Sequence, residues 1–131
     1  MKVETEEFWG GGERHVRVKN NSAIEAYVRC TPLFTVRDQY GNVCDAVIVE
    51  NEILDVNYED WVRIGSYYYC KKPVGGGKYT PFLIEGCKKT TEDGKRIELE
   101  FLVSAIDSSD AETVLGQWGI SVNEDGTIGG K

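Results

Sequence analysis

Hydrophobic and polar side chains alternate along much of the chain with a period of two residues. In residues 15–19 two valines alternate with three basic or polar side chains, and residues 24–30 repeat the pattern with larger apolar side chains. Such alternation is typical of a β-strand with one buried face. Similar runs predict further strands around residues 33–38, 43–49, 53–56, 60–64, 66–71, 79–85, 95–104, 117–122 and 127–129.

Two of these runs differ in the environment that their pattern predicts. The run at 43–49 is apolar on both faces near its end, which is typical of a central strand. The run at 95–104 alternates regularly at its start, which predicts one solvent-facing side. Pro81 favours an edge or bulge position for the run at 79–85, because proline cannot donate a ladder hydrogen bond.

Turn signals separate the predicted strands. Glycine-containing turns at 40–42, 92–94 and 124–126 each lie between alternating segments and predict hairpins. Ser109 and Glu112 have the spacing of a capping box, so one short helix at most is expected, near 110–116. Short strands joined by such turns predict an all-β fold, namely an antiparallel β-sandwich of the immunoglobulin-like or a related type, or a barrel.

The length of 131 residues corresponds to one domain. Three glycines at 10–12 follow an acidic N-terminal stretch and can separate it from the rest of the chain. We therefore expect a flexible acidic arm over 1–12 and a single β-sandwich domain over 13–131.

The excess of acidic over basic residues limits the kinds of partner that the chain is expected to bind. The chain has 22 Asp and Glu against 15 Lys and Arg, a formal net charge of −7. Nucleic acid is not expected as a partner, because binding a phosphate backbone needs a clustered basic surface. The N-terminus is acidic where a secretory signal is basic, and the apolar run at 46–49 is far shorter than the roughly 20 residues of a transmembrane helix. These features predict a cytoplasmic protein without a transmembrane segment.

The four cysteines, Cys30, Cys44, Cys70 and Cys87, form no C-x-x-C pair and give little support to a zinc cluster. Cys30 and Cys70 fall on the apolar faces of their predicted strands, which favours buried free thiols. A secreted form with two disulfides is the alternative, and the glycosylation sequon at 20–22 would matter only in that form.

Other chemical signals are weak. The glycines before Lys78 lack the spacing of a phosphate-binding loop, and the acidic clusters near 107–112 and 124–125 do not follow a calcium-loop pattern. His15 is the only histidine, and no nucleophile signature accompanies it. We therefore expect no catalytic residue, no metal and no cofactor.

The most unusual feature is a group of aromatic residues within a short stretch of chain. Five aromatic side chains and one arginine lie there: Tyr58, Trp61, Arg63, Tyr67, Tyr68 and Tyr69. Tyrosine, tryptophan and arginine are enriched where proteins bind each other, so Trp61, Arg63, Tyr67 and Tyr69 are our candidate partner-binding residues. These four share one face only if strand alternation continues through Gly65 and Ser66. The alternative is that the aromatic rings fill the core.

The sequence thus favours a noncatalytic binding module that contacts another protein or a second copy of itself. A membrane- or carbohydrate-binding β-sandwich, lysin-like or lectin-like, is the alternative, with exposed Trp and Tyr on lipid headgroups or sugar rings. A small hydrolase that depends on His15 is a third hypothesis.

Overall fold

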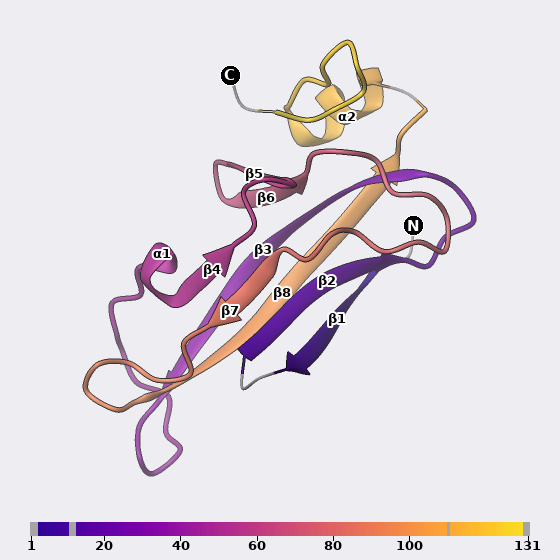
Figure 1. The fold of residues 1–131 in the computed structure, drawn as a ribbon. Coiled ribbons are helices and arrows are strands. Elements are labelled where there is room, and N and C mark those ends of the chain that lie inside the picture. The colour runs from indigo at the N-terminus through magenta and orange to yellow at the C-terminus, as the bar shows by residue number, and fades with distance from the viewer. Residues whose placement is uncertain (1–2, 11–12, 110, 130–131) are drawn as a thin grey trace.

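In the computed structural model, residues 3–10, 13–109 and 111–129 are described, and they form eight strands in two four-stranded antiparallel sheets (Figure 1). The first sheet has the order β1 (Val3–Gly10), β2 (Glu13–Asn20), β7 (Ile84–Cys87), β4 (Leu54–Val56). The second has the order β5 (Trp61–Ile64), β6 (Tyr67–Cys70), β3 (Ala26–Arg37), β8 (Arg96–Asp107). The arrangement is sandwich-like and is not a closed barrel, so the predicted all-β sandwich class is confirmed.

The main core lies between the two sheets, because each sheet turns one apolar face toward the other. β2 contributes Val16 and Val18, and β3 contributes Val28 and Cys30, all of them fully buried. These are the positions at which the two-residue alternation of the sequence places apolar side chains. Trp61 is the bulkiest side chain in this core.

A helix covers the outer face of the second sheet at one end. Helix α2 (Ala111–Trp118) confirms the short helix expected near 110–116, although Asp110 lies outside the described residues. Val114 of α2 is buried, and a second apolar cluster joins it to Tyr27, Tyr69, Ile120 and Ile128. Figure 1 shows α2 at one end of the molecule, with β3 and β8 extending away from it. A single helical turn, α1 (Glu50–Ile53), was not predicted.

Strands β3 and β8 are longer than the sequence predicted, since β3 joins the runs at 24–30 and 33–38. β3 pairs with β8 along its whole length but with β6 at Arg29 and Cys30. Pro32 comes two residues after Cys30, at a point where β3 no longer pairs with β6, and this is a setting in which a strand tolerates proline.

Three predicted strands are wrong, and a fourth is displaced, because the run at 79–85 overlaps β7 only at its last two residues. Residues 43–49 form no strand and pair with the sheet only through a bridge between Val43 and Arg37. Residues 117–122 include the end of α2, and residues 127–129 contribute only a bridge between Val122 and Ile128. In each case the alternation of side chains is too short to fix what the segment pairs with, and tertiary contacts decide it.

The N-terminal segment is part of the first sheet. β1 pairs with β2 along its length, and the register sets Glu4 opposite Lys19 and Glu6 opposite Arg17. The flexibility of the expected arm over 1–12, and its separation from a domain over 13–131, stay predictions, and residues 1–2 and 11–12 lie outside the described residues.

The turn after β2 is held by the loop at 74–78. Asn20 is fully buried, and its side-chain amide donates hydrogen bonds to the carbonyls of Ile24 (2.8 Å) and Val74 (2.9 Å). Gly76 approaches this turn so closely that a Cβ there would lie 2.7 Å from the backbone of Ala23. The glycine run at 75–77 therefore includes a position of close backbone packing.

Candidate functional site

The hairpin β5–β6 decides where the four candidate partner-binding residues lie. Its register sets Ile64 opposite Tyr67 and Arg63 opposite Tyr68 across the turn at Gly65 and Ser66. Residues directly opposite each other share a face, so the two-residue turn joins odd positions of β5 to even positions of β6. The strand alternation therefore does not continue through Gly65 and Ser66. That continuation was the condition for the four candidate residues to share one face.

The predicted set consequently divides between the two faces of the second sheet. Trp61 and Arg63 lie on the inner face, and Trp61 is fully buried with its indole N–H donating to the Pro81 carbonyl at 3.2 Å. Tyr67 and Tyr69 lie on the outer face, where Tyr69 is buried against Trp118 of α2. The four side chains do not form one exposed surface.

The outer face beside α2 combines aromatic, cationic and exposed apolar side chains. The Arg29 guanidinium lies 3.9 Å from the ring centre of Tyr67 and 4.8 Å from that of Trp118. Its Nε donates to the hydroxyl of Ser104 at 3.2 Å, which fixes its orientation. We call this area the Tyr67 surface and define it by the residues Arg29, Thr31, Leu33, Tyr67, Leu102 and Trp118.

Two leucines of the Tyr67 surface are exposed to solvent. Leu102 is 59% exposed and Leu33 is 44% exposed. The register of β3 and β8 sets Leu102 opposite Thr31, and Leu33 is two residues further along β3 on the same face. Sequence analysis missed Arg29, Leu33 and Leu102, because nothing in the local pattern shows that α2 covers only one end of this face.

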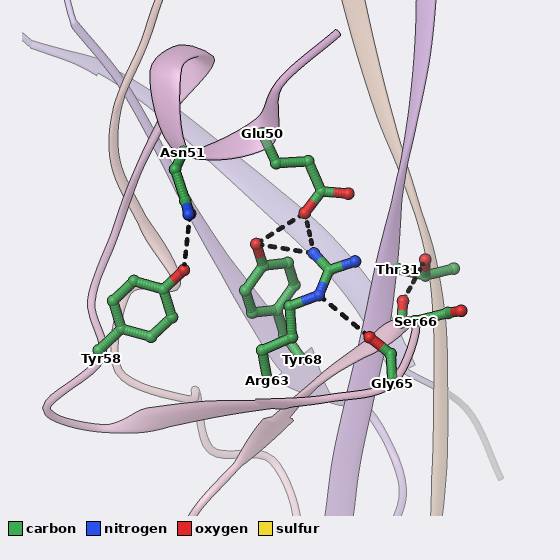
Figure 2. A network of polar contacts seen from close by, with 8 residues as sticks. All are labelled: Thr31, Glu50, Asn51, Tyr58, Arg63, Gly65, Ser66 and Tyr68. Atoms are coloured by element: carbon green, nitrogen blue, oxygen red, sulfur yellow. Dashed lines mark hydrogen bonds and ion pairs between the residues drawn. The ribbon is translucent and has the colours of Figure 1, made fainter.

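Arg63 belongs to a different site, a polar cluster on the inner face beneath α1 (Figure 2). Its Nη1 forms an ion pair with Glu50 and donates to the Tyr68 hydroxyl at 3.0 Å, and its Nε donates to the Gly65 carbonyl at 3.1 Å. The Tyr68 hydroxyl in turn donates to Glu50 Oε2 at 2.9 Å. These bonds fasten the single turn of α1 to the β5–β6 hairpin.

The electrostatics of this cluster favour anchoring over catalysis. Burial raises the pKa of Tyr68, and the neighbouring Tyr58 raises it further, against an opposing effect of Arg63. A raised pKa keeps the phenol neutral, so it acts as a hydrogen-bond donor and is a poor nucleophile or base. Beside it lies a cavity of about 290 Å³ lined by Val49, Glu50, Asn51, Tyr58 and Arg63.

The remaining chemical candidates have ordinary surroundings. His15 packs edge-on against Phe82, with ring centres 5.7 Å apart. All four cysteines are free thiols, and Cys30 and Cys70 are buried as expected. Within residues 3–10, 13–109 and 111–129, no cluster of three or more metal-binding side chains is present. No helix in that part of the chain is long and apolar enough to span a membrane.

Scans of protein-family models, of curated proteins and of solved structures found no match to this chain.

Proposed function

We propose that this protein is a noncatalytic interaction module that binds protein through the Tyr67 surface. The observation that supports the proposal is the Arg29 side chain held between Tyr67 and Trp118, beside the exposed Leu33 and Leu102. Aromatic and arginine side chains dominate binding energy when they are held rigidly, because little side-chain entropy is lost on association.

A second copy of the chain is the partner that this face fits best. α2 stands above one end of the outer face and leaves the rest of the β3–β8 ribbon uncovered (Figure 1). Two copies related by a twofold axis near Leu33 and Leu102 would each place α2 over the uncovered ribbon of the other. Such an interface is isologous and closes as a dimer.

The charges along the uncovered ribbon agree with this arrangement. Moving along the outer face away from α2, the chain presents Arg29, then Glu100 and Glu98, then Arg37 and Arg96, and Glu98 is already paired with these last two arginines. A twofold axis near Leu33 and Leu102 would bring Arg29 of one copy toward Glu98 and Glu100 of the other. Complementary charges of this kind set orientation and partner choice more than affinity.

Light scattering across a range of concentrations tests the proposal. The wild-type chain should show the mass of a dimer as concentration rises, and Leu102→Asp should remain a monomer at the same concentrations. Ile24→Asp is a matched control, because Ile24 is a similarly exposed apolar side chain that is not among the residues of the Tyr67 surface. A monomer at every concentration for the wild-type chain, or equal dimerisation by both variants, would overturn the proposal.

A further inference from the structure

Residues 43–49 form an exposed apolar segment outside both sheets. Val47 is 93% exposed, Val43 is 65% exposed and Val49 is 47% exposed. β-Branched residues favour extended backbone and are enriched in strands. This run, whose pattern predicted a central strand, therefore lies on the surface and is joined to the sheets through the bridge between Val43 and Arg37.

The backbone of this segment is largely unpaired. Cys44 N–H donates to the Val36 carbonyl at 2.9 Å, and the Val49 carbonyl accepts from Glu52 at 3.0 Å. Between these two points, the backbone groups of residues 45–48 have no hydrogen-bond partner in the part of the chain that the structure describes. A backbone whose N–H and C=O groups are unpaired can accept another strand along its free edge.

A groove runs beside the same segment. It is a cavity of about 420 Å³, bounded by residues 45–49 and 52–53 on one side and by residues 88–95 on the other. The side chains of Ala46, Val47 and Ile48 line it and give it an apolar wall. The groove therefore offers both an edge for pairing and space for side chains.

The rim of the groove carries an excess of negative charge. Lys95 is paired with Asp93 at 3.2 Å, and its pKa is raised chiefly by that carboxylate. The other charged side chains of the lining are Asp45, Glu52 and Glu92 against the single cation Lys88. The rim therefore attracts cationic side chains and disfavours anionic ones.

We propose that this groove binds an extended, apolar and basic segment of a partner protein, which pairs as a strand with residues 45–48. The backbone edge supplies main-chain hydrogen bonds, the apolar wall takes alternate side chains, and the acidic rim selects lysine or arginine at the ends of the bound segment. A second copy of residues 45–48 is a poor occupant, because it would bring the carboxylate of Asp45 and no cation to an acidic rim. The site is separate from the Tyr67 surface.

Synthetic peptides test the three features of the proposal. One probe alternates valine and threonine and carries lysine at both ends, and its matched partner carries glutamate there instead. A third probe has the lysine sequence with alternate backbone nitrogens methylated, which removes the donors that strand pairing requires. Calorimetry measures affinity, and amide NMR shifts report which residues are contacted.

The lysine probe should bind and shift the amide signals of residues 45–48, and the glutamate and methylated probes should bind at least about fivefold more weakly. Glu92→Lys should weaken the lysine probe and strengthen the glutamate probe. Glu124→Lys, a reversal at an exposed carboxylate outside the groove, should change neither affinity. Equal binding of the lysine and methylated probes, or no response to Glu92→Lys, would overturn the proposal. Leu102→Asp should leave this binding unchanged, which keeps the test independent of the dimer proposal.

Discussion

At the scale of single residues, Asn20 has a structural role that its local sequence does not reveal. Locally, Asn20 and its neighbours predict a turn and a glycosylation sequon. In the folded chain its amide nitrogen is buried and already donates to backbone carbonyls, including Val74 of a loop distant in sequence. The folded protein therefore offers no free amide for a glycan at this position.

Replacing Asn20 by alanine should destabilise the fold by about 3 kcal/mol, because several buried backbone groups lose their partner. Asn21→Ala provides the control, since Asn21 is exposed and its substitution should change stability by less than about 0.5 kcal/mol. Urea unfolding of the two variants measures the difference. Indistinguishable midpoints would contradict the role assigned to Asn20.

The cysteines divide into two classes that the sequence only partly revealed. Cys30 and Cys70 are fully or almost fully buried, as strand alternation predicted, whereas Cys44 and Cys87 lie in positions of intermediate burial. We expect two thiols to react with a maleimide reagent in native buffer and all four to react in denaturant. Peptide mapping should assign the fast pair to Cys44 and Cys87. Rapid native labelling of Cys30 would contradict this assignment.

At the scale of secondary-structure elements, the hairpin β5–β6 shows what the alternation of side chains can and cannot predict. Alternation correctly separated Tyr67 and Tyr69 from Tyr68 within one strand. Alternation could not predict which residues of β5 and β6 lie on the same face, because the length of the turn at Gly65 and Ser66 determines which residues of the two strands face each other. The condition for Trp61 and Arg63 to share a face with Tyr67 and Tyr69 is therefore not met, and the binding role of these four residues stays a prediction.

The same hairpin gives a prediction about stability. Tyr69→Ala should lower stability by about 3–5 kcal/mol, because it removes a buried ring that packs against Trp118. Tyr67→Ala should cost clearly less, since Tyr67 is only partly buried. Thermal unfolding compares the two variants, and a melting temperature lowered by more than roughly 10 °C is expected for Tyr69→Ala alone. Equal losses would mean that both rings fill the core to the same degree.

The loop at 74–78 is a second element whose role depends on tertiary contact. Gly76→Ala should destabilise the protein strongly, by about 2 kcal/mol or more, because its Cβ would overlap the backbone of Ala23. Gly116→Ala in α2 is the matched control, since a Cβ there meets nothing within 4 Å. That control should be neutral or stabilising by up to about 1 kcal/mol, owing to helix propensity. A loss as large for Gly116→Ala would show that added methyl groups are poorly tolerated in general.

At the scale of the whole molecule, alternation predicted the class of fold but not the assembly of its sheets. The order of the first sheet places β7 beside β2, through a pairing of Val16 with Ile84, residues far apart in sequence. Local patterns carry no information on such pairings, which depend on how complete sheet faces match. The exposed position of residues 43–49 follows from the same limit, because its apolar pattern alone predicted a central strand.

The buried ionisable groups of the core predict how stability depends on pH. Burial raises the pKa of the Cys70 thiol to about 11, and burial together with the nearby Cys70 raises that of Cys30 still further. Burial is also the main cause of the raised pKa values of Tyr27 and Tyr68. In the unfolded chain these groups ionise at lower pH than in the folded protein. The unfolded state therefore binds fewer protons than the folded state once the pH exceeds the pKa of the free thiol.

The contribution of the buried thiols to the free energy of unfolding should therefore be constant up to about pH 9 and then fall, by about 1.4 kcal/mol per pH unit for each buried thiol, as far as pH 11 for Cys70. Urea unfolding at about pH 8, 9 and 10 measures this slope. Cys30→Ala should reduce the slope above pH 9 whatever its effect on stability at neutral pH. A stability that does not change between these pH values would contradict the burial of neutral thiols in the inter-sheet core.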